Sequence, residues 1–565
     1  MIKARNPSQP KGCLIGYNTN EPTTFVSKNR FRGRIQDLSP CIPYIVSNTI
    51  IFIVNLLKRF ASRLSTTYGL DLRSLALFRL GLALVIIYDL TDRILDMSDH
   101  YTDDGVLPRN ILIEYMFGIW EWSLHLTFGH YFGILILFIL AYLAAFSLFI
   151  GYKSKWAATI SWILMASLQT RNPMILQSGD ELLKMLLLWS IFLPMDSFYS
   201  VDSPKSNRLR PHFSIASIGF STQLIIVYVF AGLFKLAERH WLGGEALFLA
   251  FGAVDINAHL SRLLLQFHSF LRLSNHLTLF FEIFFPLLLW MPWKNHFWRV
   301  ALILSYVAFH INIFLTFQVG IFVIVPMAAW LAFLPPCVWN SSLGIKLHAF
   351  LIGLASYVQR IFHLSKDKIN PLKLKTSTTW ALSVLWITVV SWNITTLPGL
   401  PFRFPDSLRP FIYGTTLQQA FGMFSVTLPR SGWIWIPGVL NSGDYVDLTI
   451  DGGALPLRSQ LPLINRQNNP NDRWGKFTEC LVANHGSLRL HYGKFLCKKV
   501  NQNSPGNRKL DAFKIMFIRY NLKPDGTYAG PIVDELWNHE CEQGMGEKWQ
   551  SQLECLSGGP PCPKK

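Results

Sequence analysis

Long apolar runs between residues 74 and 395 constrain this chain more than any other feature, and several of them carry an ionisable residue. A run of about 18 or more apolar residues is long enough to cross a bilayer as a helix. A charge at the centre of such a helix costs about 2.5–3.5 kcal/mol on insertion scales, so Arg79, Asp89, Lys235 and Glu282 need partners or a function. The runs predict a multi-pass membrane protein with a polar interior, where function is expected.

The composition favours this class over a soluble or nucleic-acid-binding protein. Hydrophobic residues make up 50% of the chain and charged residues only 15%, whereas soluble proteins have about 25% charged residues. The net charge is +18, but the basic residues lie mostly in short loops beside apolar runs, where membrane orientation and anionic lipid account for them. No zinc-finger spacing, phosphate-binding glycine loop or base-stacking motif occurs. The predicted partner is therefore a lipid bilayer and not nucleic acid.

We expect a membrane all-α helical bundle of about nine transmembrane helices, preceded by a cytoplasmic tail and an interfacial helix at 43–60. The expected spans are residues 74–95, 128–150, 157–176, 182–194, 213–236, 277–292, 300–317, 319–335 and 380–397. Basic segments fall before the first span and after the second, fourth, sixth and eighth, the last in a long loop at 336–379. The positive-inside rule then places the N-terminus in the cytoplasm. The predicted regions are 1–70, the membrane domain 71–397, and an exterior domain 398–565.

The exterior domain is expected to be β-rich and disulfide-bonded. Turn residues separate four strand-like segments, WIWIPGVL, YVDLTI, SLRLHYG and FKIMFIRYNL. Five of the chain's 8 cysteines lie in this region, and an exterior location permits disulfides. Cys480 and Cys497 flank an expected hairpin and are the favoured pair. The alternative is that these cysteines are unpaired small hydrophobic residues, and none of them has zinc-site spacing.

The polar bend RNPMILQSGDELLK at 171–184 is the strongest local signal for chemistry. Proline and glycine interrupt the apolar pattern there, and irregular backbone at membrane depth is tolerated only where it is buried or lines a cavity. Asn172 and Asp180 would then face a substrate, with Asp180 as an acid or base. They would converge with their polar neighbours Gln177, Ser178, Glu181 and Lys184. The alternative is an ordinary exterior loop with solvated charges.

Three further ionisable residues lie on expected spans. Lys235 either reaches the interface with its ammonium group or points inward, pairs with an acid and becomes a candidate general base. Glu282 is in mid-span, and pairing with Arg79, Lys235 or His310 would satisfy it, even if the pair is purely structural. His310 is either a hydrogen-bonded core residue or a catalytic one. We expect the exterior loop YTDDGVLPR at 101–109 to cover the mouth of the bundle. A metal site in this loop is the less favoured alternative.

Several of these stretches resemble one known family. They are DLRSLALFRLGLALVIIYDL, YTDDGVLPR, RNPMILQSGDELLKMLLLWSIFLP, YVFAGLFKL with WLGGEAL, HLTLFFEIFFPLLLW, and FHINIFLTFQVGIF with LAFLP. In this order, over about residues 70–340, the chain resembles the HTTM (horizontally transferred transmembrane) family, whose membrane domain vitamin K-dependent gamma-carboxylases share. The resemblance implies a helical membrane domain with an active chamber on the lumenal or periplasmic side, in the endoplasmic reticulum or a bacterial inner membrane.

The resemblance also implies a chemistry. The carboxylases oxygenate a reduced quinone, and the strong base that results removes a γ-proton from a glutamate side chain before CO2 is added. A reduced quinone is therefore the expected cofactor, and no metal is expected. The carboxylases carry a lysine just before the segment that Arg171 and Asn172 resemble, but the stretch here is ILMASLQT, which has none.

Two functions follow from the sequence. The first is a carboxylase-like membrane lyase that acts on an exterior peptide or small molecule. Its expected chamber residues are Asn172, Asp180, Lys235, Glu282 and His310. The second is a non-enzymatic carrier or a scaffold that presents the exterior domain to a partner.

Overall fold

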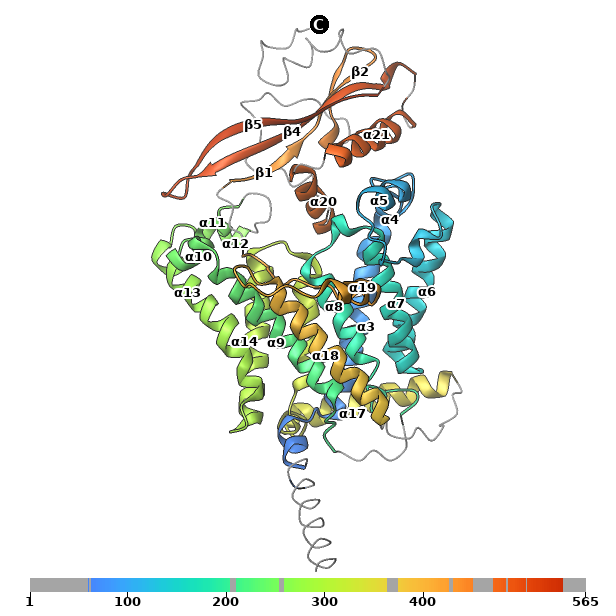
Figure 1. Ribbon diagram of the computed structural model, residues 1–565, viewed down its shortest axis with the longest axis vertical. Coiled ribbons are helices and arrows are strands. Elements are labelled where there is room, and N and C mark those ends of the chain that lie inside the picture. The colour runs from blue at the N-terminus through green and yellow to red at the C-terminus, as the bar shows by residue number, and fades with distance from the viewer. Residues whose placement is uncertain are drawn as a thin grey trace, which may run out of the picture. The chain divides into compact units, whose positions relative to one another are not determined.

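The computed structural model describes residues 59, 62–203, 210–253, 259–362, 374–425, 430–450, 471–483, 486–502, 504 and 506–541 (Figure 1). The chain falls into two compact units, Met1–Arg63 and Leu64–Lys565. The expected tail and the interfacial helix at 43–60 lie almost wholly outside the described residues. The helices and strands from α3 onward belong to the second unit.

The structure is mostly helical, and five of the described helices are long and apolar enough to cross a membrane. They are α3 (Leu72–Leu95), α6 (Tyr131–Ile150), α9 (Ile215–Leu236), α13 (His268–Phe284) continued by η3 (Phe285–Trp290), and α14 (Asn295–Thr316). They coincide with the expected first, second, fifth, sixth and seventh spans. These helices support an integral membrane protein of the multi-pass class.

The other four expected spans are helical too, but they are not among these five. They correspond to α7 (Ser154–Arg171), α8 (Ser178–Ser190), the segment formed by η4 (Gly320–Phe322), α15 (Ile324–Trp330) and η5 (Leu331–Phe333), and α18 (Thr376–Thr396). The helix α8 has only 13 residues, fewer than the roughly 17 that a spanning helix needs. The total of nine spans therefore stays a prediction.

The loop expected at 336–379 is wrong in its first half, because residues there form α16 (Pro336–Trp339) and the 20-residue α17 (Ser342–Ile361). Ser341 caps α17, and its hydroxyl accepts a hydrogen bond from the Gly344 amide at 3.1 Å. Many apolar side chains of α17 are exposed, as on an amphipathic helix. Lys346 and Arg360 lie on this helix and lower its apolar content, so the sequence predicted a loop there.

Short helices join the long ones. They are α4 (Met97–Tyr101), α5 (Arg109–Tyr115), η1 (Leu124–Leu126), η2 (Pro173–Ile175), α10 (Arg239–Gly243), α11 (Ala246–Phe251), α12 (His259–Leu264), η6 (Asp406–Leu408) and α19 (Arg409–Gly414).

The C-terminal region contains a five-stranded antiparallel sheet (Figure 1). Its strands are β1 (Arg430–Trp435), β2 (Pro437–Leu440), β3 (Tyr445–Asp447), β4 (Leu510–Leu522) and β5 (Tyr528–Glu540). The long β4 is central: β1 and β2 pair along one edge of it, β5 pairs along the other, and β3 pairs with β2. Three of the four expected strand segments are therefore confirmed in whole or in part.

The fourth expected strand, SLRLHYG, is wrong because it lies within the helix α21 (Gly486–Gln502). Its buried residues Leu488, Phe495 and Leu496 recur at i, i+7 and i+8, which is the spacing of one helix face. The alternation that suggested a strand covers only a few residues of this longer pattern. A second helix, α20 (Asp472–Val482), precedes it and packs against η2.

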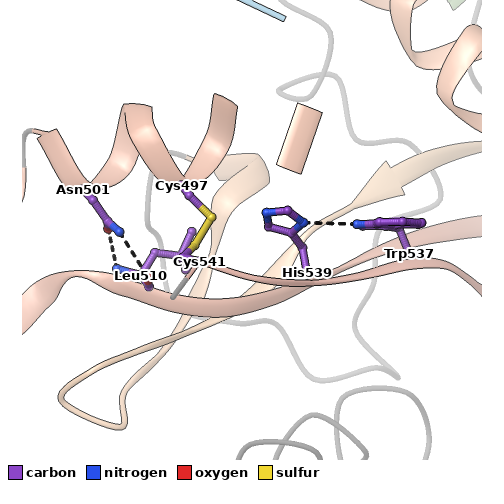
Figure 2. Close-up of a disulfide and its surroundings, with 6 residues drawn as sticks. All are labelled: Cys497, Asn501, Leu510, Trp537, His539 and Cys541. Carbon is purple, nitrogen blue, oxygen red and sulfur yellow. Dashed lines mark hydrogen bonds between the residues drawn. A yellow bond between two sulfur atoms is a disulfide. The ribbon is translucent and has the colours of Figure 1, made fainter. Parts of the chain in front are cut away.

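The expected Cys480–Cys497 disulfide is also wrong, because no hairpin joins these residues. Cys497 on α21 pairs with Cys541 at the end of β5, with Cα atoms 5.5 Å apart (Figure 2). Asn501, one turn further along α21, exchanges hydrogen bonds with the backbone of Leu510 on β4. Cys480 lies on α20 with a free thiol. The bridge and the Asn501 contacts fix α21 to the sheet.

We expect peptide mapping of the non-reduced protein to recover the Cys497–Cys541 linkage. The bridge closes a separation of 44 residues, for which the chain-entropy model gives about 4 kcal/mol of stabilisation. Cys541→Ser should therefore lower the thermal stability of the C-terminal region, measured by hydrogen exchange of β4 and β5. Cys480→Ser is the control and should change neither the linkage nor the exchange. Recovery of Cys480 in a disulfide with Cys497 would contradict this assignment.

Candidate functional site

Four buried charges from three separate helices form one ion network. Arg93 on α3 binds Asp89 one turn earlier, with Nε to Oδ2 at 2.8 Å, and also binds Asp180 on α8. Arg473 on α20 binds both carboxylates, and its Nη2 lies 3.2 Å from Asp180 Oδ1. All four side chains are at most 1% exposed. Asp92 lies at the edge of the network, 3.2 Å from Arg473 Nε.

Local capping fixes the geometry of two members of the network. Asp180 lies in the first turn of α8, where its Oδ2 accepts a hydrogen bond from the Gln177 amide at 2.9 Å. Asn471 caps α20 and accepts from the amide of Arg473 at 3.1 Å. Burial acts to raise the pKa of Asp180, but Arg473 and Arg93 hold that pKa below its usual range. Asp180 is therefore an ionised partner in a salt bridge, and not a poised acid.

Asn172 ties two loops together. Its Nδ2 donates to the carbonyl of His100 at 3.0 Å, and its Oδ1 accepts from the Met174 amide at 3.2 Å. The neighbouring Arg171 donates to two carbonyls of the 101–109 loop, including that of Leu107 at 2.9 Å. Both groups of the Asn172 amide are thus bonded to backbone, an arrangement that positions the polar bend.

The 101–109 loop is held by its own charges. Asp103 accepts from Arg109, with Nη2 to Oδ2 at 2.7 Å. Two exposed ion pairs connect the neighbourhood of this loop to α21: Lys499 lies 2.7 Å from Asp99, and Lys498 binds Asp104. Within the described residues, no cluster of His, Cys, Asp and Glu has the arrangement of a metal site.

Lys235 on α9 and Glu282 on α13 form a further buried ion pair between helices, separate from the Arg473 network. Lys235 Nζ lies 2.7 Å from Oε2 and 3.0 Å from Oε1 of Glu282, with both side chains at most 8% exposed. The ammonium group also lies 5.3 Å from the centroid of the Trp241 ring. Of the three partners expected for Glu282, the structure selects Lys235. The inward orientation of Lys235 is confirmed, and its ammonium group is occupied by the carboxylate.

His310 belongs to a separate aromatic cluster. Its Nε2 lies 2.9 Å from the Tyr228 hydroxyl, which also accepts a hydrogen bond from Trp330 Nε1 at 3.0 Å. His310 Nδ1 is buried and has no hydrogen-bond partner among the described residues. No hydrogen bond or ion pair between described residues joins Asp180 to Lys235, Glu282 or His310. The expected chamber residues therefore form at least three distinct groups.

A cavity of about 1140 Å³ lies between the helical bundle and α20. Its walls come from α3, the first turn of α8, the end of α9, residues 318–322, residues 420–425 and α20. The acidic residues that line it are Asp92, Glu181, Glu238, Asp472 and Glu479, with Lys476 as the basic one. Phe234, Phe322, Met423 and Phe424 add apolar wall. A polar, acidic interior with aromatic walls suits a ligand that donates hydrogen bonds.

Two of these carboxyl groups have perturbed protonation. Burial raises the pKa of Glu181 from 4.5 to about 7 and that of Asp472 from 3.8 to about 6. Glu181 accepts a hydrogen bond from the Ala420 amide at 2.9 Å, and Asp472 accepts from Gln177 Nε2 at 2.6 Å. Groups that titrate near neutral pH in a cavity are candidates for proton transfer.

None of the five expected catalytic residues lines this cavity, but their neighbours Gln177, Ser178 and Glu181 do. The polar bend thus lines the cavity through Gln177, Ser178 and Glu181, whereas Asp180, the residue favoured from the sequence, does not line it. Asp472 and Arg473 were also missed, because their partners Gln177, Asp180 and Asp89 lie 293 to 384 residues earlier in the sequence. One local indication of the network was present in the sequence. Asp89 and Arg93 are spaced i, i+4 on an apolar helix, which is the spacing of an ion pair.

Comparison with models of known families, with curated proteins and with solved structures finds no match to this chain. The resemblance to the HTTM family therefore stays a prediction from the sequence.

Replacing Arg473 should disrupt the contact between α20 and the bundle. Arg473→Leu leaves the buried charges of Asp89 and Asp180 with one arginine between them, and breaking a buried pair costs about 3–5 kcal/mol. We expect a lower melting temperature and faster proteolysis after residue 425 in the purified protein. Lys476→Ala is the control, since it removes an exposed pair with Glu479 that is worth about 1 kcal/mol or less. Equal effects of the two substitutions would contradict a central role for the network.

The two perturbed carboxyl groups predict a pH dependence of stability. Because the folded-state pKa values are raised, the folded chain binds more protons than the unfolded chain between about pH 4 and pH 7. Their contribution to stability therefore falls as pH rises through this window. We expect the melting temperature of the wild type to fall, relative to that of the Glu181→Gln/Asp472→Asn double variant, between pH 5 and pH 8. Glu479→Gln should retain the wild-type dependence, and parallel curves for wild type and double variant would refute the assignment.

Proposed function

We propose that this chain is a membrane enzyme that binds its substrate in the cavity between the bundle and α20. The observation that carries the proposal is the lining of that cavity. Candidate membrane helices and the C-terminal region contribute carboxyl groups to one cavity, and its volume of about 1140 Å³ is large enough for a small molecule or a peptide side chain. A purely structural contact between the two regions does not require such a space.

Glu181 and Asp472 are the proposed proton-transfer groups. Both line the cavity and come from different elements, α8 and α20. Burial brings the pKa of each close to neutral pH, where an acid or base works best. Asn172 and Asp180 are proposed to act as positioning residues, because the first holds the polar bend and the second holds α20 through Arg473.

The cavity suits the reduced quinone that the HTTM resemblance implies. Phe234, Phe322 and Met423 offer apolar wall for a ring, and the carboxylates of Glu181 and Asp472 offer acceptors for its two hydroxyl groups. When bound, a reduced quinone would supply the reducing equivalents for an oxygenation. The residues of this chain would orient the ring, limit its access to water and accept protons.

The test is an assay of the purified full-length protein in oxygenated buffer, with dissolved O2 as the oxidant, a reduced quinone, labelled CO2 and a glutamate-containing peptide. We expect quinone oxidation that depends on the protein, and Glu181→Gln should lower the rate by about 10²-fold or more, as for loss of a general acid or base. Incorporation of label would support the carboxylase version, and absence of turnover with every quinone tested would reject that version. Glu114→Gln changes an exposed glutamate that does not line the cavity and is the matched control.

Variants of the buried Lys235–Glu282 pair test whether these two residues have a catalytic or a structural role. Glu282→Gln alone leaves the Lys235 charge unpaired and should destabilise the fold by about 3–5 kcal/mol. The Lys235→Met/Glu282→Leu double variant removes both charges and should fold. If the double variant folds but loses turnover, the pair takes part in chemistry. If turnover is unchanged, the pair is structural.

The second candidate function is a scaffold that presents the C-terminal region to a partner. The observation that favours it is the complete pairing of the buried charges in the Arg473 network. If the chain is a scaffold, Glu181→Gln and Asp472→Asn should fold and leave its function intact. Loss of function in either variant would reject it.

A further inference from the structure

A second, smaller cavity shares no lining residue with the acidic one and differs from it in chemistry. Its volume is about 250 Å³, and its lining includes Tyr68, Ser217, Leu289, Trp290, Arg299 and Phe333. It lies where α9 begins, where the candidate span His268–Trp290 ends, and where α14 begins. Ends of three candidate spans meet there, so the cavity is expected at one boundary of the hydrocarbon core, where lipid phosphates lie.

Arg299 gives this cavity an uncompensated positive charge. The residue is 3% exposed. Its Nη1 donates to the carbonyl of Gly69 at 2.9 Å and its Nη2 to that of Thr67 at 3.2 Å, while its Nε is buried without a hydrogen-bond partner in the described chain. No ion pair between described residues includes Arg299. A buried cation without a counter-charge is costly, and an anion in the cavity would remove that cost.

The donor inventory also favours an anion over a neutral ligand. A guanidinium group has five N–H donors in a planar fork, and the two carbonyl contacts leave three of them for an oxyanion. The hydroxyl of Tyr68 donates to the Trp290 carbonyl, and that of Ser221, which also lines the cavity, donates to the Ser217 carbonyl. These hydroxyl groups are therefore occupied, and Arg299 is the group left to bind a ligand.

The backbone adds positive potential at the same place. Ser217 lies in the first turn of α9, and Arg299 lies in the second turn of α14. Helix N-termini carry partial positive charge and favour anions, phosphates in particular. The remaining wall is apolar, with Leu289 and Phe333 at most 2% exposed. A positive centre beside an apolar wall matches a phosphate group that is joined to hydrocarbon.

We propose that this cavity binds the phosphate group of an anionic phospholipid, with the phosphate on Arg299 and the start of an acyl chain against Leu289 and Phe333. Bidentate contact between a guanidinium and phosphate oxygens is a strong, charge-assisted arrangement. Basic pockets between membrane helices bind lipid head groups in this way. The site is separate from the acidic cavity, and the proposal does not depend on the enzyme assignment.

The test uses delipidated full-length protein and three probes, each of which carries a different combination of the parts of a phospholipid. Phosphatidylglycerol has both acyl chains and phosphate, diacylglycerol has the acyl chains alone, and inorganic phosphate has the anion alone. We expect native mass spectrometry to show one retained phosphatidylglycerol per protein, and the melting temperature to rise with this probe only. Equal retention of diacylglycerol, or an equal rise in melting temperature with inorganic phosphate, would overturn the lipid assignment.

Three variants locate the site. Arg299→Gln should weaken phosphatidylglycerol binding by about tenfold or more, as for loss of a charge-assisted hydrogen bond. Ser221→Phe keeps Arg299 and fills the cavity, so it tests the site even if Arg299→Gln fails to fold, and it should abolish retention. Lys294→Gln removes an exposed charge from the turn before α14 and should change binding by no more than about twofold. If Lys294→Gln weakens binding as much as Arg299→Gln, or if Ser221→Phe retains the lipid, the proposal is wrong.

Discussion

The buried network of Arg93, Asp89, Asp180 and Arg473 is the interaction on which the arrangement of the second unit depends. Two arginines and two aspartates are all buried away from water. The desolvation cost of each charge is offset only while its partners are in place. Arg473 belongs to α20, whereas the other three belong to α3 and α8. The C-terminal region is therefore joined to the helical bundle through an electrostatic requirement that a purely apolar contact would not impose.

Other buried charges of the bundle meet the same requirement in different ways. Lys235 and Glu282 neutralise each other across two helices. Arg79 instead donates to the carbonyls of Leu148 and Phe149, near the end of α6 where helix carbonyls lack partners, and to that of Tyr199, in each case at 2.6 Å. Arg299 also relies on carbonyls, but it lines a cavity. The difference in surroundings is what makes Arg79 a structural residue and Arg299 a candidate ligand-binding residue.

The sequence predicted the features that depend on local composition. Apolar length located the five long helices, and the cost of a charge in lipid singled out Asp89, Lys235 and Glu282 as residues in need of partners. Features that depend on distant contacts could not be predicted in this way. Nothing near Arg473 indicates that its partners are Asp89 and Asp180, and the pairing of Cys497 depends on where β5 ends. Short alternating stretches also misled, because within α21 the helical period shows only over the full 17 residues.

The position of the acidic cavity next to the network has a thermodynamic consequence. Asp472 is adjacent to Arg473 in α20, and Asp92 contacts both the cavity and the Arg473 guanidinium. One wall of the cavity exists only while α20 is bound to the bundle. A ligand that contacts Glu181 on one wall and Asp472 on the other therefore binds only the docked arrangement, and by linkage it stabilises that arrangement in proportion to the logarithm of its concentration. A ligand bound in this way and the ion network would thus favour the same state of the chain, and loss of Arg473 would weaken ligand binding even though Arg473 need not touch the ligand.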